Sequence, residues 1–236
     1  MPDVETSGGC GAGVLELIDV MDRLRSPGGC PWDRQQTHAS LAPYAVEEVY
    51  ELLEAIDRLG EQDAPPPAQE QVRRAHLREE LGDLLLQVVF HARLATEHPR
   101  DPFDIDDVAR GIAAKLRRRH PHVFGDVVAG TPEAVSTNWE RLKAAEKPER
   151  TGPLDGIPAG LPELARAGTM LSRLDRAGRS GLVDRVLAQA RGCGDPVRDH
   201  GARILTLVVQ ARAAGVDAAA GLRTVLNDLE DAAGSS

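Results

Sequence analysis

The sequence predicts an all-α fold on three observations. Aromatic residues make up only 3% of the 236 residues although 42% are apolar, so the core must consist mainly of Leu, Val, Ile and Ala. Strands are usually richer in aromatic and β-branched residues. Apolar residues recur at helical spacing along several long segments, and no segment shows a convincing run of the alternation typical of strands.

The first helix is expected over residues 14–24. Its apolar positions recur every three or four residues, as in an amphipathic helix, and they are Val14, Leu17, Ile18, Met21 and Leu24. The residues before it, 1–12, are expected to be disordered. Pro and Gly in SPGGCPWD, residues 26–33, end this helix.

The second helix is expected to begin at Ser40, whose side chain can act as its N-cap. Pro43 is tolerated because the first turn of a helix does not need its amide hydrogen. An apolar stripe then follows the helix and consists of Leu41, Ala45, Val49, Leu52 and Ile56. Most acidic residues of this segment lie off the stripe.

A proline-rich loop separates this helix from the next one. Three prolines in GEQDAPPPAQEQ, residues 60–71, predict the loop. A long helix is expected over residues 72–97, and the side chains expected to point inward are Leu77, Leu81, Leu84, Leu85, Val88 and Ala92. Asp104 is expected to cap the following helix, and His120 with Pro121 to end it.

The rest of the chain is expected to be helical apart from one linker. Thr131 as N-cap and Pro132 at the first helical position are a strong start signal. The Pro/Gly-rich residues 148–162 predict a linker. We therefore expect a first domain over residues 13–147 and a helical C-terminal region over residues 163–236.

Charge and cysteine content narrow the class of protein. The net charge is −9 and the pI about 5.3, so we expect no non-specific binding to nucleic acid or to an anionic membrane. Cys10, Cys30 and Cys193 are scattered, which argues against a disulfide framework and a common zinc site. The N-terminus lacks a signal-peptide pattern, and no apolar stretch approaches the roughly 18 residues of a membrane span. The expected location is the cytoplasm.

One predicted helix concentrates negative charge. YAVEEVYELLEAID, residues 44–57, holds five carboxylates in fourteen residues and contains no Lys or Arg. Two like charges about 4 Å apart repel by roughly 4 kcal/mol at an effective dielectric near 20. Either water screens these charges, a basic neighbour pairs with them, or a cation lies between them.

Spacing on two helices makes the cation a specific hypothesis. Glu48 and Glu51 are three residues apart and Glu47 and Glu51 four apart, so they share a helical face. Glu80 and Asp83 are again three apart on the next long helix. If the two helices pack antiparallel, as a short connection favours, their carboxylates form an oxygen cage suited to Mg²⁺ or Mn²⁺. The alternative is a solvated acidic face.

A basic cluster follows in KLRRRHPHVFG. Lys115, Arg118 and Arg119 share a helical face by their spacing. Metal-binding carboxylates together with a basic face are what a triphosphate needs. The alternative is a basic C-terminal cap, which the polarity of the helix favours in any case.

These motifs together resemble the MazG family of nucleoside triphosphate pyrophosphohydrolases. The likeness is carried by GGCPWDRQQTHASLAPYAVEEVYELLEAID, LREELGDLLLQVVFHARLA, KLRRRHPHVFGD and NWERLKAAEK. The resemblance implies a helical bundle that dimerises, with its catalytic domain over residues 13–147. It also implies Mg²⁺-dependent hydrolysis of a nucleoside or deoxynucleoside triphosphate to the monophosphate and pyrophosphate.

The resemblance further implies roles for single residues. The implied metal ligands are Glu48, Glu51, Glu80 and Asp83. Glu47 is either a further ligand or the group that orients the attacking water. The implied substrate-binding residues are Lys115, Arg118, Arg119 and Trp139. Trp139 could equally be a core residue, and the signature loop CPWDRQQTH is given no firm role.

Other functions stay open on the residues alone. A dUTPase-like or phosphoribosyl-ATP-specific enzyme would use the same arrangement of carboxylates. A non-catalytic helical regulator could bind a nucleotide or a protein and release no pyrophosphate. A ferritin-like di-iron protein needs ExxH pairs, and neither carboxylate helix contains one.

The C-terminal region is expected to be a degenerate second copy of the first domain. A shift of 119 residues lays EELGDLLLQVVFHAR (79–93) over RDHGARILTLVVQAR (198–212). The apolar pattern survives, but Asp83 falls on Ala202 and no EExxE motif precedes the second segment. We therefore expect one type of active site, in the N-terminal half. The alternative is that any two amphipathic helices align this well.

Overall fold

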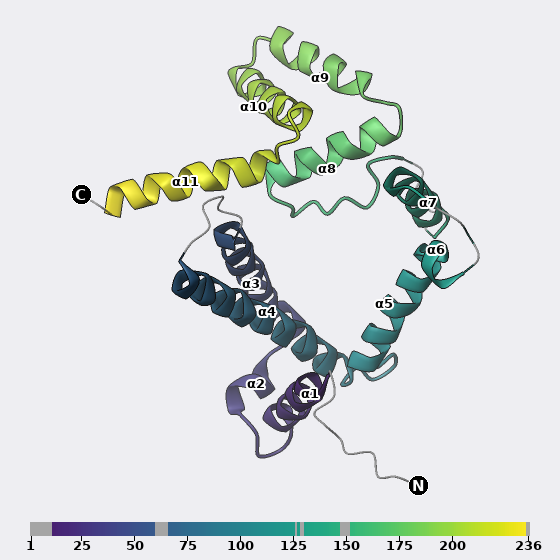
Figure 1. The fold of residues 1–236 in the computed structure, drawn as a ribbon, viewed down its shortest axis with the longest axis vertical. Helices are drawn as coiled ribbons and strands as arrows, with labels where there is room; N and C mark the ends of the chain where they lie inside the picture. The colour runs from purple at the N-terminus through teal and green to yellow at the C-terminus, as the bar shows by residue number, and fades with distance from the viewer. Residues whose placement is uncertain (1–10, 60–65, 126, 128–129, 147–151, 235–236) are drawn as a thin grey trace. The chain divides into compact units, whose positions relative to one another are not determined.

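Helices are the regular elements of this chain (Figure 1). The computed structural model describes residues 11–59, 66–125, 127, 130–146 and 152–234. The helices are α1 (Ala12–Arg25), α2 (Pro31–Gln35), α3 (His38–Leu59), α4 (Pro67–Ala95), α5 (Ile105–Arg119), α6 (Pro121–Phe124), α7 (Pro132–Ala145), α8 (Glu163–Arg176), α9 (Gly181–Gly192), α10 (Pro196–Ala213) and α11 (Ala218–Gly234). These described residues contain no strand, which confirms the predicted all-α fold.

The chain divides into two compact units, residues 1–128 with α1 to α6 and residues 129–236 with α7 to α11. The boundary between them precedes α7, whereas the domain predicted from the sequence extends to residue 147. Residues 1–10, expected to be disordered, lie outside the described residues, as do residues 148–151 of the predicted linker. The predicted domain boundaries stay a prediction.

Local capping signals set several helix ends as predicted. Asp104 caps α5, because its carboxylate accepts from the Asp107 amide at 2.9 Å and the Asp107 carboxylate accepts from the Asp104 amide at 3.1 Å. α5 ends at Arg119, directly before the His–Pro pair predicted to stop it. Thr131 Oγ1 accepts from the Ala134 amide at 3.3 Å at the start of α7.

Two predicted helix starts are wrong. α3 begins at His38, because Thr37 supplies the cap that the sequence assigned to Ser40. The Ser40 amide donates to Thr37 Oγ1 at 3.1 Å and the Thr37 amide donates to Ser40 Oγ at 2.8 Å, a reciprocal arrangement like a capping box. Pro43 therefore lies inside the helix. α4 begins at Pro67, inside the predicted loop, because a proline at the first helical position sacrifices no hydrogen bond.

α3 and α4 form an antiparallel hairpin, as the sequence predicted. His38, at the start of α3, contacts His91, near the end of α4. Arg73, near the start of α4, donates to the carbonyl of Arg58 at the end of α3, at 2.8 Å. These pairings place the acidic segments of the two helices next to each other.

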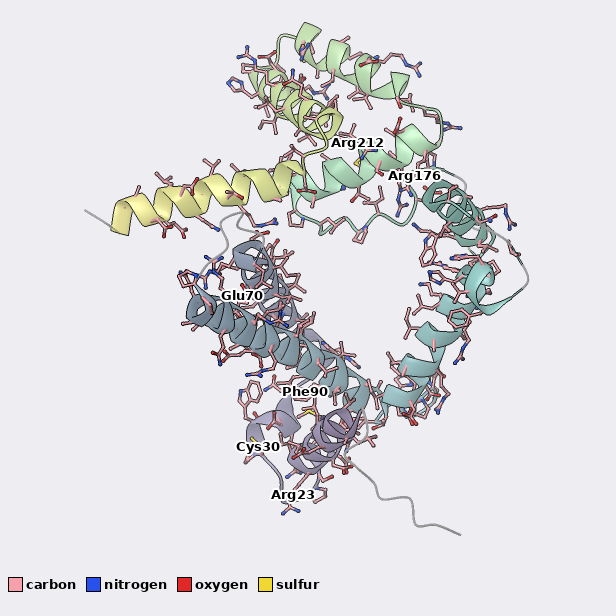
Figure 2. All side chains as sticks on the ribbon, viewed as in Figure 1. Arg23, Cys30, Glu70, Phe90, Arg176 and Arg212 are labelled. Atoms are coloured by element: carbon pink, nitrogen blue, oxygen red, sulfur yellow. The ribbon has the colours of Figure 1, made fainter. Side chains whose placement is uncertain are left out.

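The core of the first unit lies where α1 packs against this hairpin. Its buried side chains are Met21, Leu41, Val89, Phe90 and Leu94. Phe90, labelled in Figure 2, lies where α4 meets α1. Burying each of these side chains contributes about 1.5–3 kcal/mol, so this cluster fixes the end of α4 against α1.

Arg25, the last residue of α1, is buried and fully engaged. Its guanidinium binds both carboxylate oxygens of Glu97, at 3.0 and 2.8 Å. It also donates to the backbone carbonyls of Asp33 and Gln36 and lies 5.7 Å from the centre of the Phe90 ring. One side chain thus joins α1, the CPWDRQQTH loop and the end of α4.

The inward positions predicted for α4 are wrong in part, and the apolar stripe predicted for α3 is only partly buried. Val49 and Ile56 of α3 are 42% and 46% exposed, and Leu81 and Val88 of α4 are 49% and 41% exposed. The side chains buried along α4 include Glu80 instead. The reason is that one helix pair covers only one side of each helix, whereas α3 and α4 carry apolar residues over a wider arc.

The second unit has a small apolar core of its own, formed by Leu171, Leu174, Leu187, Ala202 and Val208. α10 packs against both α8 and α9. It contains residues 198–212, the segment aligned with α4, so the hypothesis of a second copy concerns α9 and α10. No single helix of the described residues is long and apolar enough to cross a membrane, and α10 with α11, bent by 103°, passes such a test only as a pair.

Candidate metal centre

Three carboxylates from the two hairpin helices converge. Glu48 comes from α3, while Glu80 and Asp83 come from α4. Each offers one oxygen atom, and these atoms all lie within 4.8 Å of one another. In the part of the chain that the structure describes, this is the only such group of three or more Asp, Glu, His or Cys side chains. Packing of α3 against α4 therefore brings together residues that are more than thirty positions apart.

Glu80 is the buried member of this acidic cluster, at 7% exposure. Its Oε1 lies 3.1 Å from His76 Nδ1, and its buried Oε2 has no hydrogen-bond partner among the described residues. Burial raises the pKa of Glu80, His76 opposes that shift, and the Glu51 and Asp83 charges add to it. A buried carboxylate oxygen without a partner is unfavourable, so Glu80 Oε2 is a strong candidate ligand atom.

Glu48 is half-buried and sits among like charges. Burial raises its pKa most, followed by the Asp83 carboxylate, and Glu51 raises it further through its charge and a hydrogen bond. Gln87 Nε2 donates to Glu48 Oε1 at 3.5 Å and acts in the opposite direction. Mutual repulsion of this kind disappears when a cation lies between the carboxylates.

The donor set fits a hard divalent cation. All converging atoms are carboxylate oxygens, the ligands that Mg²⁺ and Mn²⁺ prefer. The structure brings Glu48, Glu80 and Asp83 together and places Glu51 within electrostatic reach of Glu48 and Glu80. Glu47 is exposed and lies outside the group of three.

Sequence reasoning missed two side chains that contact the cluster, His76 and Gln87. His76 precedes Glu80 by four residues and Gln87 follows Asp83 by four, so all four lie on one face of α4. This spacing is the signal that could have identified them. Partners of metal ligands fix the orientation of those ligands, and the His76 contact with Glu80 Oε1 leaves Oε2 for another partner.

The predicted substrate-binding residues lie on α5 of the first unit and on α7 of the second. On α5, Lys115 is half-buried, Arg118 is exposed and Arg119 is buried. α5 packs its first residue, Ile105, against the core and extends away from the α3–α4 hairpin (Figure 1). The basic end of α5 therefore lies apart from the acidic cluster within the first unit. Trp139 is half-buried on α7, in the second unit, and its role stays a prediction.

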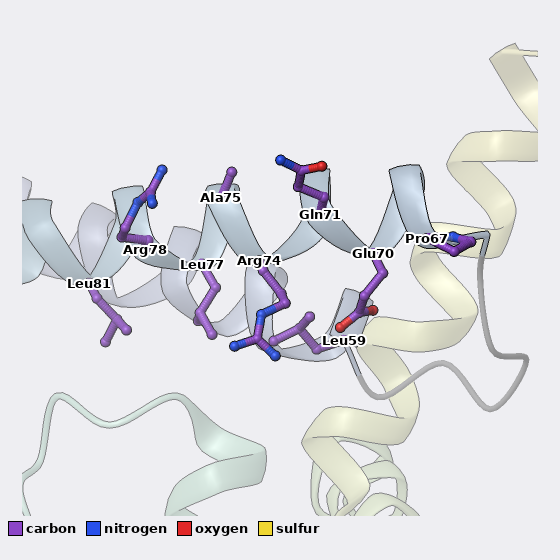
Figure 3. A pocket seen from close by; sticks show the side chains of 9 residues that line it. All are labelled: Leu59, Pro67, Glu70, Gln71, Arg74, Ala75, Leu77, Arg78 and Leu81. Atoms are coloured by element: carbon purple, nitrogen blue, oxygen red, sulfur yellow. The ribbon is translucent and has the colours of Figure 1, made fainter.

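A separate hollow of about 830 Å³ lies near the connection between α3 and α4 (Figure 3). It is lined by Leu59, Pro67, Glu70, Gln71, Arg74, Ala75, Leu77, Arg78 and Leu81. In Figure 3, Glu70 and Arg74 lie on the same side of α4, next to Leu59. None of the converging carboxylates lines this hollow, so it is distinct from the candidate metal centre and continues the exposed apolar side of α4.

Comparison with known proteins places the acidic cluster in a defined domain. Residues 36–124 match the MazG nucleotide pyrophosphohydrolase domain. A nucleoside triphosphate pyrophosphohydrolase of Escherichia coli (strain K12) is 44% identical over 168 residues, which cover 70% of this chain and 58% of that protein. The nucleoside triphosphate pyrophosphohydrolase/pyrophosphatase MazG of Thermotoga maritima is 51% identical over 138 residues, which cover 58% and 47%. The chain thus spans about half the length of these two relatives.

A third relative matches almost the whole chain. An uncharacterized 26.1 kDa protein from the blaB 3′ region of Streptomyces cacaoi is 44% identical over 236 residues, which cover 98% of this chain and 87% of that protein. The matched domain contains the converging carboxylates of α3 and α4 and the basic end of α5. On the domain match and these identities, the chain belongs to the MazG family.

Proposed function

We propose that this protein hydrolyses nucleoside triphosphates, including deoxynucleoside triphosphates, to the monophosphate and pyrophosphate with Mg²⁺ as its cofactor. Mn²⁺ is a possible substitute, since it favours the same oxygen ligands. The observation that carries the proposal is the convergence of Glu48, Glu80 and Asp83 inside a matched MazG nucleotide pyrophosphohydrolase domain. The proposed role is the control of nucleotide pools in the cytoplasm.

The proposed chemistry follows from charge. Glu48, Glu51, Glu80 and Asp83 would hold the ion, which would offset the charge of the phosphates and would make water at the site more acidic. Glu47, which is exposed and directly precedes Glu48 in the sequence, is our candidate for orienting the attacking water. Attack at the α-phosphorus breaks its bond to the bridging oxygen, and pyrophosphate leaves. Basic side chains stabilise the charge that develops on the leaving group.

A nucleotide panel tests this proposal. Each nucleoside and deoxynucleoside triphosphate is incubated with the protein and Mg²⁺, and release of pyrophosphate and monophosphate is measured. We expect both products in equal amounts and none after chelation of the metal. A regulator that only binds nucleotides would give neither product, and release of orthophosphate with the diphosphate would place the attack at the γ-phosphorus instead.

Lys115 and Arg118 are proposed to bind the triphosphate, and their replacement should weaken that binding. We expect Lys115→Ala and Arg118→Ala each to raise KM about tenfold, since charge-assisted hydrogen bonds are worth roughly 1.5–3 kcal/mol. Steady-state kinetics measures this. Arg117→Ala is the matched control, because it removes a charge from another face of the same turn. Equal KM values for all three variants and the wild type would contradict triphosphate binding by Lys115 and Arg118 and leave them only a helix-capping role.

We propose a homodimer as the working state. Support comes from Val49, Ile56, Leu81 and Val88, which are apolar, recur at helical spacing and are more than 40% exposed. A second copy covering these side chains would bury them. It would also allow α5 of that copy to bring its basic end toward a triphosphate at the acidic cluster.

Charge on the exposed apolar side should disrupt the proposed dimer. We expect Leu81→Asp to sediment as a monomer at micromolar concentrations where the wild type is a dimer, because an interfacial carboxylate without a partner is strongly unfavourable. Val72→Asp is the control, since Val72 lies on α4, is 68% exposed and points from a different face of the helix. If the Leu81→Asp protein stays dimeric, this face of the hairpin is not part of the dimer interface.

We also propose that only the first unit is catalytic and that the second is a degenerate copy. The domain match ends at residue 124, and the described residues of the second unit contain no converging group of three potential metal ligands. Both observations support the proposal, which places packing or partner contacts in the second unit.

A further inference from the structure

The signature loop between α1 and α3 presents an exposed aromatic side chain on a fixed backbone. Trp32 is 53% exposed, yet its loop is held in place by several hydrogen bonds. The Trp32 carbonyl accepts from Gln36 Nε2 at 3.1 Å, and Arg25 donates to the carbonyls of Asp33 and Gln36. A large apolar side chain held in solvent by an ordered backbone is suited to contact a ligand.

Trp32 is paired with a second aromatic residue, Tyr44 of α3. The two ring centres are 6.2 Å apart and the ring planes meet at 72°, an edge-to-face arrangement. Such pairs are attractive and hold both rings in defined orientations. Tyr44 is itself 43% exposed, so aromatic surface of the pair is left for a third planar group.

This aromatic pair lies beside the acidic cluster. Tyr44 precedes Glu48 by four residues and Glu51 by seven, so the three side chains share one face of α3. About one helical turn, roughly 5.4 Å along the axis, separates Tyr44 from Glu48. A ligand that reaches both places needs a planar ring and a metal-binding anion joined by a short spacer, as a nucleotide has in its base, phosphates and sugar.

We infer that Trp32 and Tyr44 form the subsite that stacks the nucleobase of the substrate. The inference rests on the proposed hydrolysis of nucleoside triphosphates at the acidic cluster and adds a residue-level account of how the base is held. Every base has a π face, so stacking tolerates differences between bases. This subsite therefore favours nucleotides over base-free polyphosphates and does not select one base.

Fluorescence of Trp32 tests the stacking directly. The chain contains two tryptophans, so the Trp32 fluorescence is obtained as the difference between the wild type and Trp32→Phe, and Trp139 stays in place in both proteins. We expect a non-hydrolysable α,β-imido nucleoside triphosphate with Mg²⁺ to quench this fluorescence, and inorganic triphosphate with Mg²⁺ to leave it unchanged. Calorimetry on both proteins establishes that each ligand binds. A nucleotide that binds without quenching, or equal quenching by both ligands, overturns the inference.

Substitution provides the second test. Trp32→Ala and Tyr44→Ala should weaken nucleotide binding roughly 5- to 100-fold, the range for loss of one base–aromatic stack, for all bases alike. Affinity for inorganic triphosphate should not change. Tyr50→Ala is the matched control, since Tyr50 lies on the same helix with 46% exposure but on another face. Nucleotide affinities of both variants within about twofold of wild type overturn the inference.

Two further outcomes are distinguishable. If Trp32→Ala changes only the oligomeric state measured by light scattering, the aromatic pair is an interface between copies and the inference is wrong. If the alanine variants fail to fold by circular dichroism, the quenching experiment still decides, because it observes Trp32 in the wild type and needs only the conservative variant Trp32→Phe. If the proposed hydrolysis is wrong but the stacking inference is right, the wild-type protein will bind and stack nucleotides and release no pyrophosphate.

Discussion

Replacing Glu80 by Gln is expected to abolish hydrolysis and to raise the thermal stability of the metal-free protein. The activity should fall by about three orders of magnitude or more, because the change removes a charged candidate ligand of the metal. Stability should rise because Glu80 is buried among Glu48, Glu51 and Asp83, and its Oε2 has no partner among the described residues. A neutral amide lacks the repulsion and can still accept from His76.

The sign of the pH dependence follows from the raised pKa of Glu80, which burial causes. The folded state binds this proton more tightly than the unfolded state does, so the ionised carboxylate destabilises the fold at neutral pH. That destabilisation is present above the folded-state pKa and is relieved as the pH falls through it. We therefore expect the melting temperature of Glu80→Gln to exceed that of metal-free wild type at pH 7 and the two to converge on acidification.

Two measurements complete this experiment. Saturating Mg²⁺ should raise the melting temperature of the wild type, since a ligand that binds only the folded state stabilises it, and should have little effect on the variant. Glu79→Gln is the matched control, because it removes a neighbouring exposed carboxylate that does not belong to the converging group. If the rate of hydrolysis by Glu80→Gln is within about threefold of the wild-type rate, Glu80 is not a ligand of the metal.

Replacing Arg25 by Ala is expected to have the largest effect on stability, a loss of about 2–3 kcal/mol. Broken buried ion-pair and hydrogen-bond networks fall in this range, and the estimate is kept low because the Glu97 side chain is 45% exposed and water screens the charge left behind. The variant loses the bidentate contact with Glu97, two bonds to loop carbonyls and the contact with Phe90. Chemical denaturation measures the free energy of unfolding.

Acidification separates the ion pair from the rest of this network. The hydrogen bond from Arg25 lowers the pKa of Glu97 more than any other contact. The resulting stabilisation is present above the unfolded-state pKa and is lost as the pH falls through the folded-state pKa, so the gap between wild type and Arg25→Ala should narrow at low pH. Arg93→Ala is the control, because Arg93 also binds Glu97 but contacts neither loop carbonyl. A gap below about 0.5 kcal/mol at neutral pH would show that the loop is held by other contacts.

Helix ends show where local sequence suffices for the fold. The caps at Asp104 and Thr131 need only side chains three residues from the amides they bind, so they are readable from the sequence. The cap of α3 was assigned to Ser40 instead of Thr37, because both hydroxyls are in range and only the observed reciprocal bonds distinguish them. The start of α4 at Pro67 was missed because a proline can either begin a helix or prevent one.

In the candidate site, too, the sequence predicts what lies on one helix, whereas only the packing of helices decides the rest. Spacing placed Glu48 with Glu51 on one helix and Glu80 with Asp83 on the next. Spacing within a helix cannot give the distance between helices, so it could not show that Glu80 is buried and Glu47 exposed. The same helical spacing could have identified His76 and Gln87. Their importance, however, depends on how few other hydrogen-bond partners Glu80 and Glu48 have, which spacing cannot show.

The sequence by itself determined that the chain is helical, where most of its helices lie and which residues share a face of each helix. Those properties depend on contacts within about four residues and on a fixed period of 3.6 residues per turn. Only the tertiary structure decided which faces meet. It brought three carboxylates within 4.8 Å, left Leu81 and Val88 exposed and tied the CPWDRQQTH loop to Arg25. These outcomes depend on how α1, α3 and α4 pack, because helices with wide apolar arcs can pair in several ways, and the angle and register of packing are set by all side chains at the contact.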